Sequence, residues 1–434
     1  MARRRCGNVL LYVASSLRGG HVTGFRELAR AAGAALAARP DVPLALATLV
    51  QVDGSSYRQP GARLLVDATG RLLAGAISGG CLEGDVAARA GEVCASGRGI
   101  RLRYDLRADL EAIWGLGAAC DGVAHLLLEP LPDPSWLARA HAIRTQRHNG
   151  AVLMCLDPHG SGRSIALCDG DATTGSWHPI APPAPPAPPV GEPEHRAAAL
   201  AAQRTGHALL HQLPHDGSML FVEPLVAPIA LHLIGAGRGA DTFVRLAHTM
   251  EWEVTVIDHR PALLAELDVP HGVTTKVVRA DDTDALAATV AALPQDGRAA
   301  IALLSHIFEV DRAWLTAVLP LPVGYIGVLG SRARAGQLLD AVDTALATQG
   351  AAVTARMRHR LHAPIGLDLG GESPASIALA AIAEIEAVLH GRPAGFLRER
   401  QSPIHARTPT PRLVTPNEPA LSHGERVLDN DLAR

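Results

Sequence analysis

The order of apolar and polar stretches divides the chain into two parts of different texture. In the first part, short apolar runs such as LALATLV (44–50), ARLLVD (62–67) and HLLLEPL (125–131) are separated by turn-forming residues, which indicates strands and hairpins. From Leu231 onward, near-continuous apolar runs alternate with helical stretches. This alternation is typical of a parallel sheet that is covered by helices on both faces. The pattern predicts an α/β protein, with an N-terminal α+β domain followed by a C-terminal Rossmann-type, doubly wound parallel sheet.

The same pattern predicts where the domains begin and end. We expect an N-terminal domain over 20–226, a C-terminal domain over 228–395 and a disordered tail over 403–434. A proline-rich run at 178–195 favours an extended polyproline insertion within the first domain. That domain resumes afterwards, because MLFVEPLV (219–226) again has the pattern of a strand. No internal repeat is evident in the sequence.

Composition narrows the classes of protein that fit. The 434 residues carry a formal net charge of -3, so there is no overall basic field to hold nucleic acid or an anionic membrane. No apolar stretch reaches the ~18 residues that a membrane span needs. Six cysteines are scattered without a CxxC pair, which is typical of cytosolic thiols rather than a disulfide framework. We therefore expect a cytoplasmic protein that binds neither nucleic acid nor membrane.

The strongest local motif is LHLIGAGRGAD, at a predicted turn from strand to helix. Gly235 permits the tight turn, Gly237 lets the backbone approach a pyrophosphate, and Ala240 allows the helix to pack closely on the strand. Asp258 ends the next predicted strand, where a carboxylate can accept hydrogen bonds from ribose hydroxyls. This arrangement predicts a nucleotide-binding turn. The alternative is a doubly wound fold whose nucleotide site is vestigial.

A second motif, GAISGGCLEGD, places a thiol after two glycines. Gly79 and Gly80 come before a predicted helix, so their backbone N–H groups are candidates for an anion site. Cys81 falls at the predicted helix start, where the helix dipole favours a thiolate that could carry sulfur or bind a soft metal. The alternative is a small buried residue at a tight turn.

The loop GSSYRQPGAR offers groups that can contact an anion. Ser55 and Ser56 supply hydroxyls, and Arg58 and Arg63 supply guanidinium groups. The simpler interpretation is a hairpin with Pro60-Gly61 at its turn, and both interpretations can hold together.

The remaining candidates carry weaker signals. Cys120 lies in the glycine-rich loop GLGAACDG before a predicted strand, where it is either a ligand or part of a turn. His259 and His306 lie near the carboxyl ends of predicted strands, where open α/β sheets place ligands. No HExxH, GxSxG or P-loop motif occurs in the sequence.

Together these segments resemble the XdhC/CoxI family, molybdenum-cofactor chaperones that serve xanthine dehydrogenase and related molybdenum hydroxylases. The resemblance extends over roughly residues 20 to 395. It rests on the following segments of this sequence: GSSYRQPGAR, AISGGCLEGD, CDGVAHLLLEPL, FVEPL, HLIGAGRGAD, VTVIDHRP, YIGVLGSRAR and IGLDLGGESPASIALAAIAEIEAV.

The resemblance implies a binding protein with little or no turnover. Such proteins bind the molybdenum cofactor (molybdopterin or its dinucleotide form), hold it while its terminal sulfur is installed, and deliver it to the apo-enzyme. The implied partners are a cysteine desulfurase and a molybdenum hydroxylase. Cys81 and Cys120 match the family's two cysteine positions and are its candidate metal ligands. Which hydroxylase is served, and whether the protein is a homodimer, stay open.

Two other functions are alternatives to a chaperone. One is an NAD(P)-dependent oxidoreductase that uses the Rossmann domain, in which His259 or His306 would have to serve as acid or base. The other is a nucleotide-regulated scaffold that acts only through contacts with partners. The thiols of the first domain favour the chaperone, because function follows the site rather than the fold.

Overall fold

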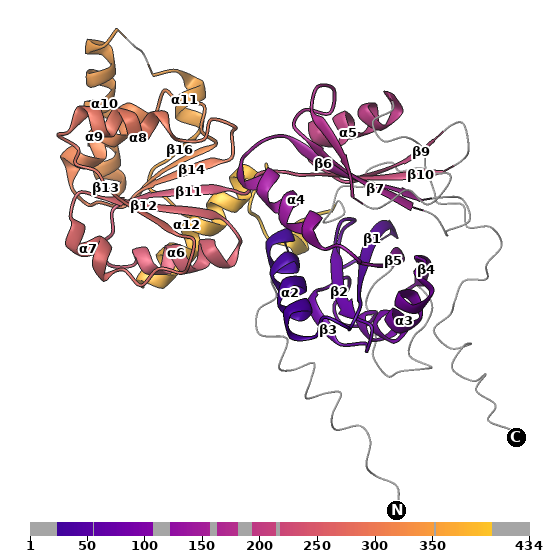
Figure 1. Ribbon diagram of the computed structural model, residues 1–434. Helices are drawn as coiled ribbons and strands as arrows, with labels where there is room; N and C mark the ends of the chain where they lie inside the picture. The colour runs from indigo at the N-terminus through magenta and orange to yellow at the C-terminus, as the bar shows by residue number, and fades with distance from the viewer. Residues whose placement is uncertain are drawn as a thin grey trace, which may run out of the picture. The chain divides into compact units, whose positions relative to one another are not determined.

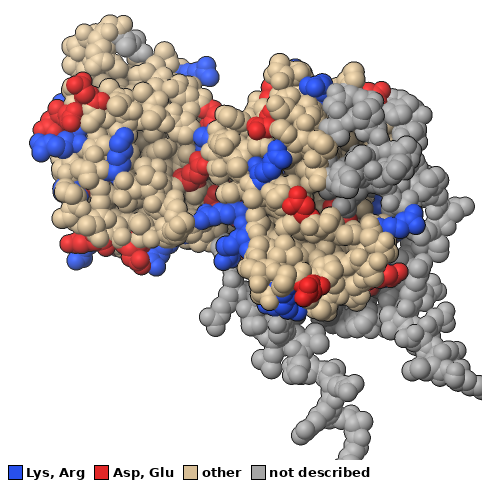
Figure 2. All heavy atoms as spheres, in the orientation of Figure 1, with Lys and Arg blue, Asp and Glu red and all other residues tan. Residues whose placement is uncertain are grey.

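A computed structural model describes residues 24–54, 56–106, 122–156, 163–180, 193–213, 218–350 and 353–401 (Figure 1). The chain divides into two compact units, one extending to Ala227 and the other beginning at Pro228. None of the described helices has the length and apolarity needed to span a bilayer. On the face drawn in Figure 2, basic and acidic side chains of the described residues are interspersed.

The N-terminal unit contains two five-stranded antiparallel sheets. Sheet A consists of β1 (Leu44–Gly54), β2 (Arg63–Asp67), β3 (Leu72–Gly75), β4 (Ile100–Asp105) and β5 (Gly122–Pro130). Sheet B consists of β6 (Gly150–Leu156), β7 (Arg163–Asp169), β8 (Ser176–Pro179), β9 (Leu209–Gln212) and β10 (Met219–Pro224). The described helices of this unit are α2 (Phe25–Ala38), α3 (Glu83–Ser96), α4 (Ser135–Thr145) and α5 (Pro193–Thr205).

The two sheets have the same topology. Their strand orders are β3-β2-β1-β5-β4 and β8-β7-β6-β10-β9, and every neighbouring pair is antiparallel. A helix precedes each sheet (α2 or α4), and a second helix (α3 or α5) joins the third strand to the fourth. The unit is therefore a tandem structural repeat, which the sequence alone did not reveal.

Short traces of the repeat persist in the sequence. In each repeat the last strand leads into Glu-Pro-Leu, at 129–131 and 223–225, and the proline pairs with the second residue of the first strand. The second strand ends at Asp67 in one repeat and at Asp169 in the other, and each pairs with the first residue of the first strand. These matches are too few and too far apart to form a repeat that a pattern search of the sequence would find.

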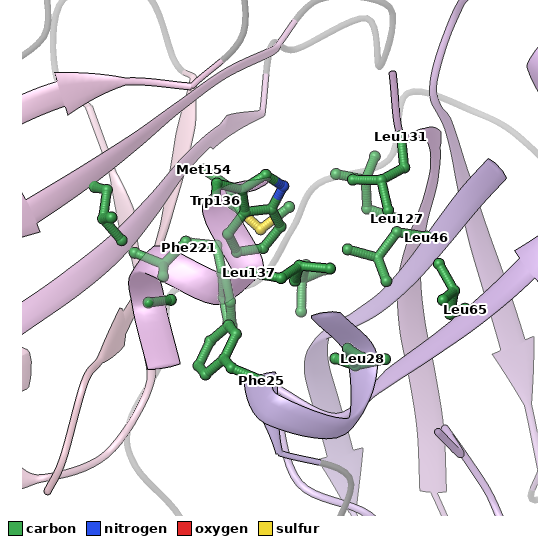
Figure 3. Close-up of a cluster of buried hydrophobic side chains, with 14 of the residues drawn as sticks. Phe25, Leu28, Leu46, Leu65, Leu127, Leu131, Trp136, Leu137, Met154 and Phe221 are labelled. Carbon is green, nitrogen blue, oxygen red and sulfur yellow. The ribbon is translucent and has the colours of Figure 1, made fainter. Parts of the chain in front are cut away.

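Helices α2 and α4 fill the space between the two sheets (Figure 3). Their apolar side chains, among them Phe25, Leu28 and Trp136, pack with side chains from both sheets in one buried cluster. Helix α3 covers the other face of sheet A, and α5 covers the other face of sheet B. The alternating strands place one set of side chains in the shared cluster and the other set under the outer helix. Each sheet is thereby buried on both faces.

The C-terminal unit is a Rossmann-type fold, as the sequence predicted. Six parallel strands lie in the order β13-β12-β11-β14-β15-β16, which is the doubly wound order 3-2-1-4-5-6. The strands are β11 (Ala230–Ile234), β12 (Glu253–Asp258), β13 (Thr274–Val277), β14 (Ala299–Leu303), β15 (Tyr325–Val328) and β16 (Leu361–His362). The helices are α6 (Ala240–Thr249), α7 (Pro261–Glu266), α8 (Thr283–Ala291), α9 (Phe308–Val318), α10 (Arg332–Thr348), α11 (Ala355–His359) and α12 (Pro374–Leu389), with a 3-10 helix at Leu397–Glu399.

The proline-rich run is shorter than predicted. His178 and Pro179 end β8, and α5 already begins at Pro193, because prolines are tolerated at strand edges and in the first turn of a helix. Residues 181–192 lie outside the described residues, as does the predicted tail over 403–434.

Candidate functional site

The motif loops of the first repeat leave sheet A at one end. Gly54, at the end of β1, pairs with Gly122 at the start of β5, and the Leu106 N–H donates to the Gly122 carbonyl at 2.8 Å. The third strand ends nearby, because Gly75 pairs with Leu64 at the beginning of β2. The register therefore places the ends of three connections, β1 to β2, β3 to α3 and β4 to β5, at the same end of the sheet. Ser55 and Cys120 belong to two of these connections and lie outside the described residues.

The first connection contains the predicted hairpin turn. The Ala62 N–H donates to the Gln59 carbonyl at 3.1 Å across Pro60-Gly61, and Gly61 has a φ of +98°. Proline followed by a glycine with positive φ is the arrangement of a type II turn. The Ser56 hydroxyl accepts a hydrogen bond from the Arg58 N–H at 3.4 Å, so Ser56 helps to shape the loop.

Two arginines were predicted to contact an anion, and one of them, Arg63, stabilises the fold instead. Its side chain is 3% exposed and forms an ion pair with Glu223 of β10 at 2.5 Å. The guanidinium carbon also lies 4.8 Å from the ring centroid of Phe25 and 5.7 Å from that of Trp136. Because this charge is buried and already balanced, the expectation that Arg63 contacts a bound anion is corrected. Instead, Arg63 links sheet A of the first repeat to sheet B of the second.

Arg58 has a different environment. It is half-buried, its Nε atom is buried without a hydrogen-bond partner, and no carboxylate of the described residues forms an ion pair with it. Its guanidinium carbon lies 5.9 Å from the ring centroid of Tyr57, which is 68% exposed. An unpaired guanidinium beside an exposed loop can receive an anionic group, so Arg58 remains a candidate.

The glycine-cysteine turn is organised by a buried carboxylate that sequence analysis missed. Helix α3 begins at Glu83, so Cys81 lies two residues before the helix rather than at its start. The Glu83 carboxylate accepts hydrogen bonds from the N–H groups of Ile77 at 3.1 Å, Ser78 at 2.8 Å and Leu82 at 3.2 Å, and also from the Ser78 hydroxyl. These N–H groups are therefore unavailable to a bound anion. Glu83 comes five residues after Ser78, whereas the two residues of a capping box are three apart. The spacing therefore gave no signal of this contact.

The outer side of this turn is open. A β-carbon at Gly79 or Gly80 would meet nothing within 4 Å, and Gly80 has a φ of +112°. The Cys81 thiol is free and exposed. The Gly80 N–H donates to the Ser78 hydroxyl at 3.1 Å, so Gly80 shapes the turn rather than binding an anion through its own N–H. A ligand can therefore reach the Cys81 thiol and the space beside Gly79.

A polar pair that sequence analysis missed lies on two adjoining strands at the same end of the sheet. The His125 Nε2 atom lies 3.3 Å from the Asp53 carboxylate, and the Gln51 side chain donates to that carboxylate at 2.9 Å. Burial lowers the pKa of His125 below its ordinary value, although the neighbouring Asp53 charge acts in the opposite direction. At the equivalent position the second repeat has Met219. A polar residue in an apolar strand was the signal available in the sequence.

The Rossmann turn has the geometry that its glycines predict. Gly235 has a φ of +123°, and a β-carbon there would lie 2.7 Å from the Leu304 carbonyl carbon and the Ser305 nitrogen. At Gly237 a β-carbon would meet nothing within 4 Å, so a ligand can approach the backbone closely. Ala240 is buried as the first residue of α6. Strands β11 and β14 lie side by side where the strand order reverses, which is where open α/β sheets bind ligands.

The Asp258 carboxylate is engaged in hydrogen bonds with this turn and with Arg260. It accepts hydrogen bonds from the Ala236 N–H at 2.7 Å and from the Arg260 side chain at 2.8 and 2.9 Å, and its side chain is 1% exposed. Burial acts to raise the pKa of Asp258, but these hydrogen bonds and the Arg260 charge lower it to about 2. The buried carboxylate leaves no exposed oxygen for a ribose hydroxyl, which corrects its expected role. His259 also lies against Asp258, with Nδ1 3.3 Å from the carboxylate.

The predicted pair of metal ligands stays a prediction. Among the described residues, no group of three or more His, Cys, Asp or Glu side chains is placed to hold a metal ion. Cys81 is the one member of the pair that the structure describes, and Cys120 lies outside the described residues.

Comparisons with known proteins agree with the two-unit fold. The model of the XdhC and CoxI family matches residues 37–105, and that of the XdhC Rossmann domain matches 231–385. A Bacillus subtilis protein named as a probable xanthine dehydrogenase subunit is 28% identical over 344 residues, which is 78% of this chain and 91% of that protein. The uncharacterized protein YqeB of Escherichia coli K12 is 30% identical over 175 residues, 40% of this chain and 30% of its own length.

The fold is also found in a solved structure. A crystal structure described as a xanthine dehydrogenase from Bacillus halodurans superimposes with a TM-score of 0.65. It covers 85% of this chain and 96% of its own, at 22% sequence identity. At that identity the likeness establishes the shared fold.

Proposed function

This chain belongs to the XdhC and CoxI family, and from that premise we propose that it is a maturation factor for a xanthine dehydrogenase-like molybdenum hydroxylase. It binds the molybdenum cofactor, holds it while a cysteine desulfurase provides the terminal sulfur, and delivers it to the apo-hydroxylase. The name of the Bacillus subtilis relative supports the choice of partner.

The observation that carries this proposal is the gathering of the motif loops at one end of sheet A. There Arg58 has a buried Nε atom without a partner, and Cys81 has an exposed thiol beside an open glycine turn. A pterin cofactor combines a phosphate with a soft metal-sulfur centre. A guanidinium suits the phosphate and a thiolate suits the soft metal, so the residues present fit this group. When bound, the cofactor supplies the metal-sulfur chemistry, whereas Arg58 and Cys81 hold and orient it.

We also propose that the Rossmann unit binds a nucleotide. The doubly wound strand order, the tight turn at Gly235 and the open approach to Gly237 support this. The same observations favour the alternative function, an NAD(P)-dependent oxidoreductase. A hydride-transfer site would need His259 or His306 as acid or base, and His259 lies against the buried Asp258 carboxylate, with Nδ1 3.3 Å from it.

The test is to purify the protein from a molybdenum-replete host and to measure its molybdenum and pterin. Protein from a host that cannot make the pterin is the matched control. The proposal expects retained cofactor in the first preparation only, together with activation of an apo-hydroxylase that increases when a cysteine desulfurase is added. Protein that retains no pterin and activates nothing would refute it. Steady NAD(P)H formation with purines or aldehydes, on the order of 1–1000 per second, would favour the oxidoreductase.

A further inference from the structure

His306, three residues after the end of β14, has an unusual backbone conformation. His306 has a φ of 60°, in the left-handed region that residues with a β-carbon seldom adopt. Three other non-glycine residues of the described chain lie in that region. Arg147 and Glu251 follow the ends of helices α4 and α6, where this conformation is an ordinary way to terminate a helix, and Ala394 lies between α12 and the 3-10 helix. His306 instead lies between a strand and the start of α9. Helix termination therefore does not account for the conformation of His306.

A buried polar network holds this backbone in place. The Ser305 hydroxyl donates to the Asp311 carboxylate at 2.5 Å and accepts a hydrogen bond from the Ile307 N–H at 3.1 Å, so it bridges across His306. Asp311 is fully buried, and its second oxygen accepts a hydrogen bond from Arg334 at 2.7 Å. The network ties the segment to α9 and α10 and makes the conformation of His306 a fixed feature of the fold.

The network also fixes where His306 lies. The Leu304 N–H donates to the Ile234 carbonyl at 2.7 Å, and the backbone of Leu304 and Ser305 lies against Gly235 of the glycine turn. His306 is the next residue, at the point where the strand order reverses between β11 and β14. It is exposed, and its imidazole has no hydrogen-bond partner in the part of the chain that the structure describes.

We propose that His306 contacts the ligand of the Rossmann unit, on the half of a dinucleotide that lies beyond the pyrophosphate. This inference rests on the proposed nucleotide binding. A dinucleotide spans the crevice at the reversal point with its pyrophosphate at the glycine turn. One half then lies over β12, and the other lies over β14, where the imidazole can hydrogen-bond a ribose hydroxyl. The polar network holds the backbone conformation of His306 at this point of the fold.

Two probes separate the halves of the ligand. NADH has both halves, whereas ADP ends at the pyrophosphate. We expect His306→Gly to weaken NADH binding about three- to tenfold, the worth of one hydrogen bond, and to leave ADP binding unchanged. His306→Asn tolerates the same backbone conformation and keeps a donor, so it should restore part of the NADH affinity. Both affinities are measured by calorimetry on the full chain.

Unfolding temperature and a matched variant complete the test. His306→Gly should unfold at or above the wild-type temperature, because glycine adopts this conformation without strain. Glu251→Gly relieves the same conformation at the far end of α6 and should change neither affinity. If His306→Gly lost NADH affinity and ADP affinity equally, or lost neither, the inference would be overturned. The proposed nucleotide binding would still stand in both cases. A wild type that binds neither probe would refute the proposed nucleotide binding, and this inference with it.

Discussion

The two repeats of the N-terminal unit fold alike but differ in the chemistry of their loops. Both have the same strand order, the Glu-Pro-Leu ending and an aspartate at the end of the second strand. In the first repeat the hairpin loop contains Arg58 and the connection to α3 contains Cys81, whereas the corresponding segments of the second repeat, 157–162 and 181–192, have neither arginine nor cysteine in their sequence. The first repeat also pairs His125 with Asp53, where the second has Met219 in place of the histidine. What the repeats share is what the fold requires. What only the first repeat has is therefore the best internal guide to its site.

Arg63 and Glu223 join the two repeats, and breaking this pair should have the largest effect. We expect Arg63→Ala to lower the free energy of unfolding of the N-terminal unit by about 3–5 kcal/mol, because it leaves a largely buried carboxylate without its partner. The measurement is denaturant unfolding, monitored by hydrogen exchange of the backbone amides in β1 and β2. This probe reports on the N-terminal unit alone, which is needed because the two units can unfold separately.

A second substitution distinguishes lost charge from lost packing. Arg63→Met combined with Glu223→Gln should recover most of the stability, because no unpaired charge is then buried. Arg71→Ala is the control. Arg71 is exposed in the turn between β2 and β3, so its loss should change stability by less than about 0.5 kcal/mol. A loss below about 1 kcal/mol in Arg63→Ala would show that the pair does not hold the repeats together.

Glu83 holds the glycine-cysteine turn of the first repeat in place. We expect Glu83→Ala to cost about 2–4 kcal/mol, because three N–H groups and the Ser78 hydroxyl lose a buried acceptor. Glu92→Ala, an exposed glutamate on the same helix, should cost much less. Thermal unfolding measures both variants, and equal losses would contradict the role assigned to Glu83.

In the Rossmann unit, the buried carboxylate of Asp258 contributes to stability in a pH-dependent way. The pKa of Asp258 falls from an ordinary value of 3.8 to about 2, so the ionised form stabilises the fold by about 2 kcal/mol. Because the pKa is depressed, this contribution is complete above pH 3.8 and is lost as the pH falls toward 2. Asp258→Asn should remove it at neutral pH. Asp268→Asn, with a side chain that is 84% exposed in the wild type, should not change stability appreciably.

The smallest effect on stability is expected from a swap between the repeats. His125→Met introduces the residue that the second repeat has at this position, and should alter stability at neutral pH by no more than about 1 kcal/mol. The folded pKa of His125 is lowered from 6.5, so the wild type loses stability as the pH falls through 6.5 toward the folded value. The variant should lose this pH dependence. Unfolding curves at several pH values test this, and parallel curves for both proteins would contradict it.

How far the sequence predicts the structure differs between the units for a physical reason. The glycine turn, α6, β12 and Asp258 are close neighbours in the sequence, so local pattern was sufficient to predict the turn. Strand β16 is only two residues long and has no periodicity to detect. In the N-terminal unit, Arg63 meets a partner 160 residues away. No local pattern could tell that Arg63 supports the fold whereas Arg58 has no ion-pair partner among the described residues.

We propose that the first repeat holds the cofactor at the end of sheet A where Cys81 lies. The most direct test is the molybdenum and pterin content of purified Cys81→Ser, with Cys94→Ser as the matched control. Cys94 is half-buried in α3, and burial raises its pKa, so its thiol is not offered to a ligand. We expect a folded Cys81→Ser protein that has lost sulfurated cofactor and hydroxylase activation, and a Cys94→Ser protein like the wild type. Wild-type cofactor content and activation in Cys81→Ser would contradict the claim.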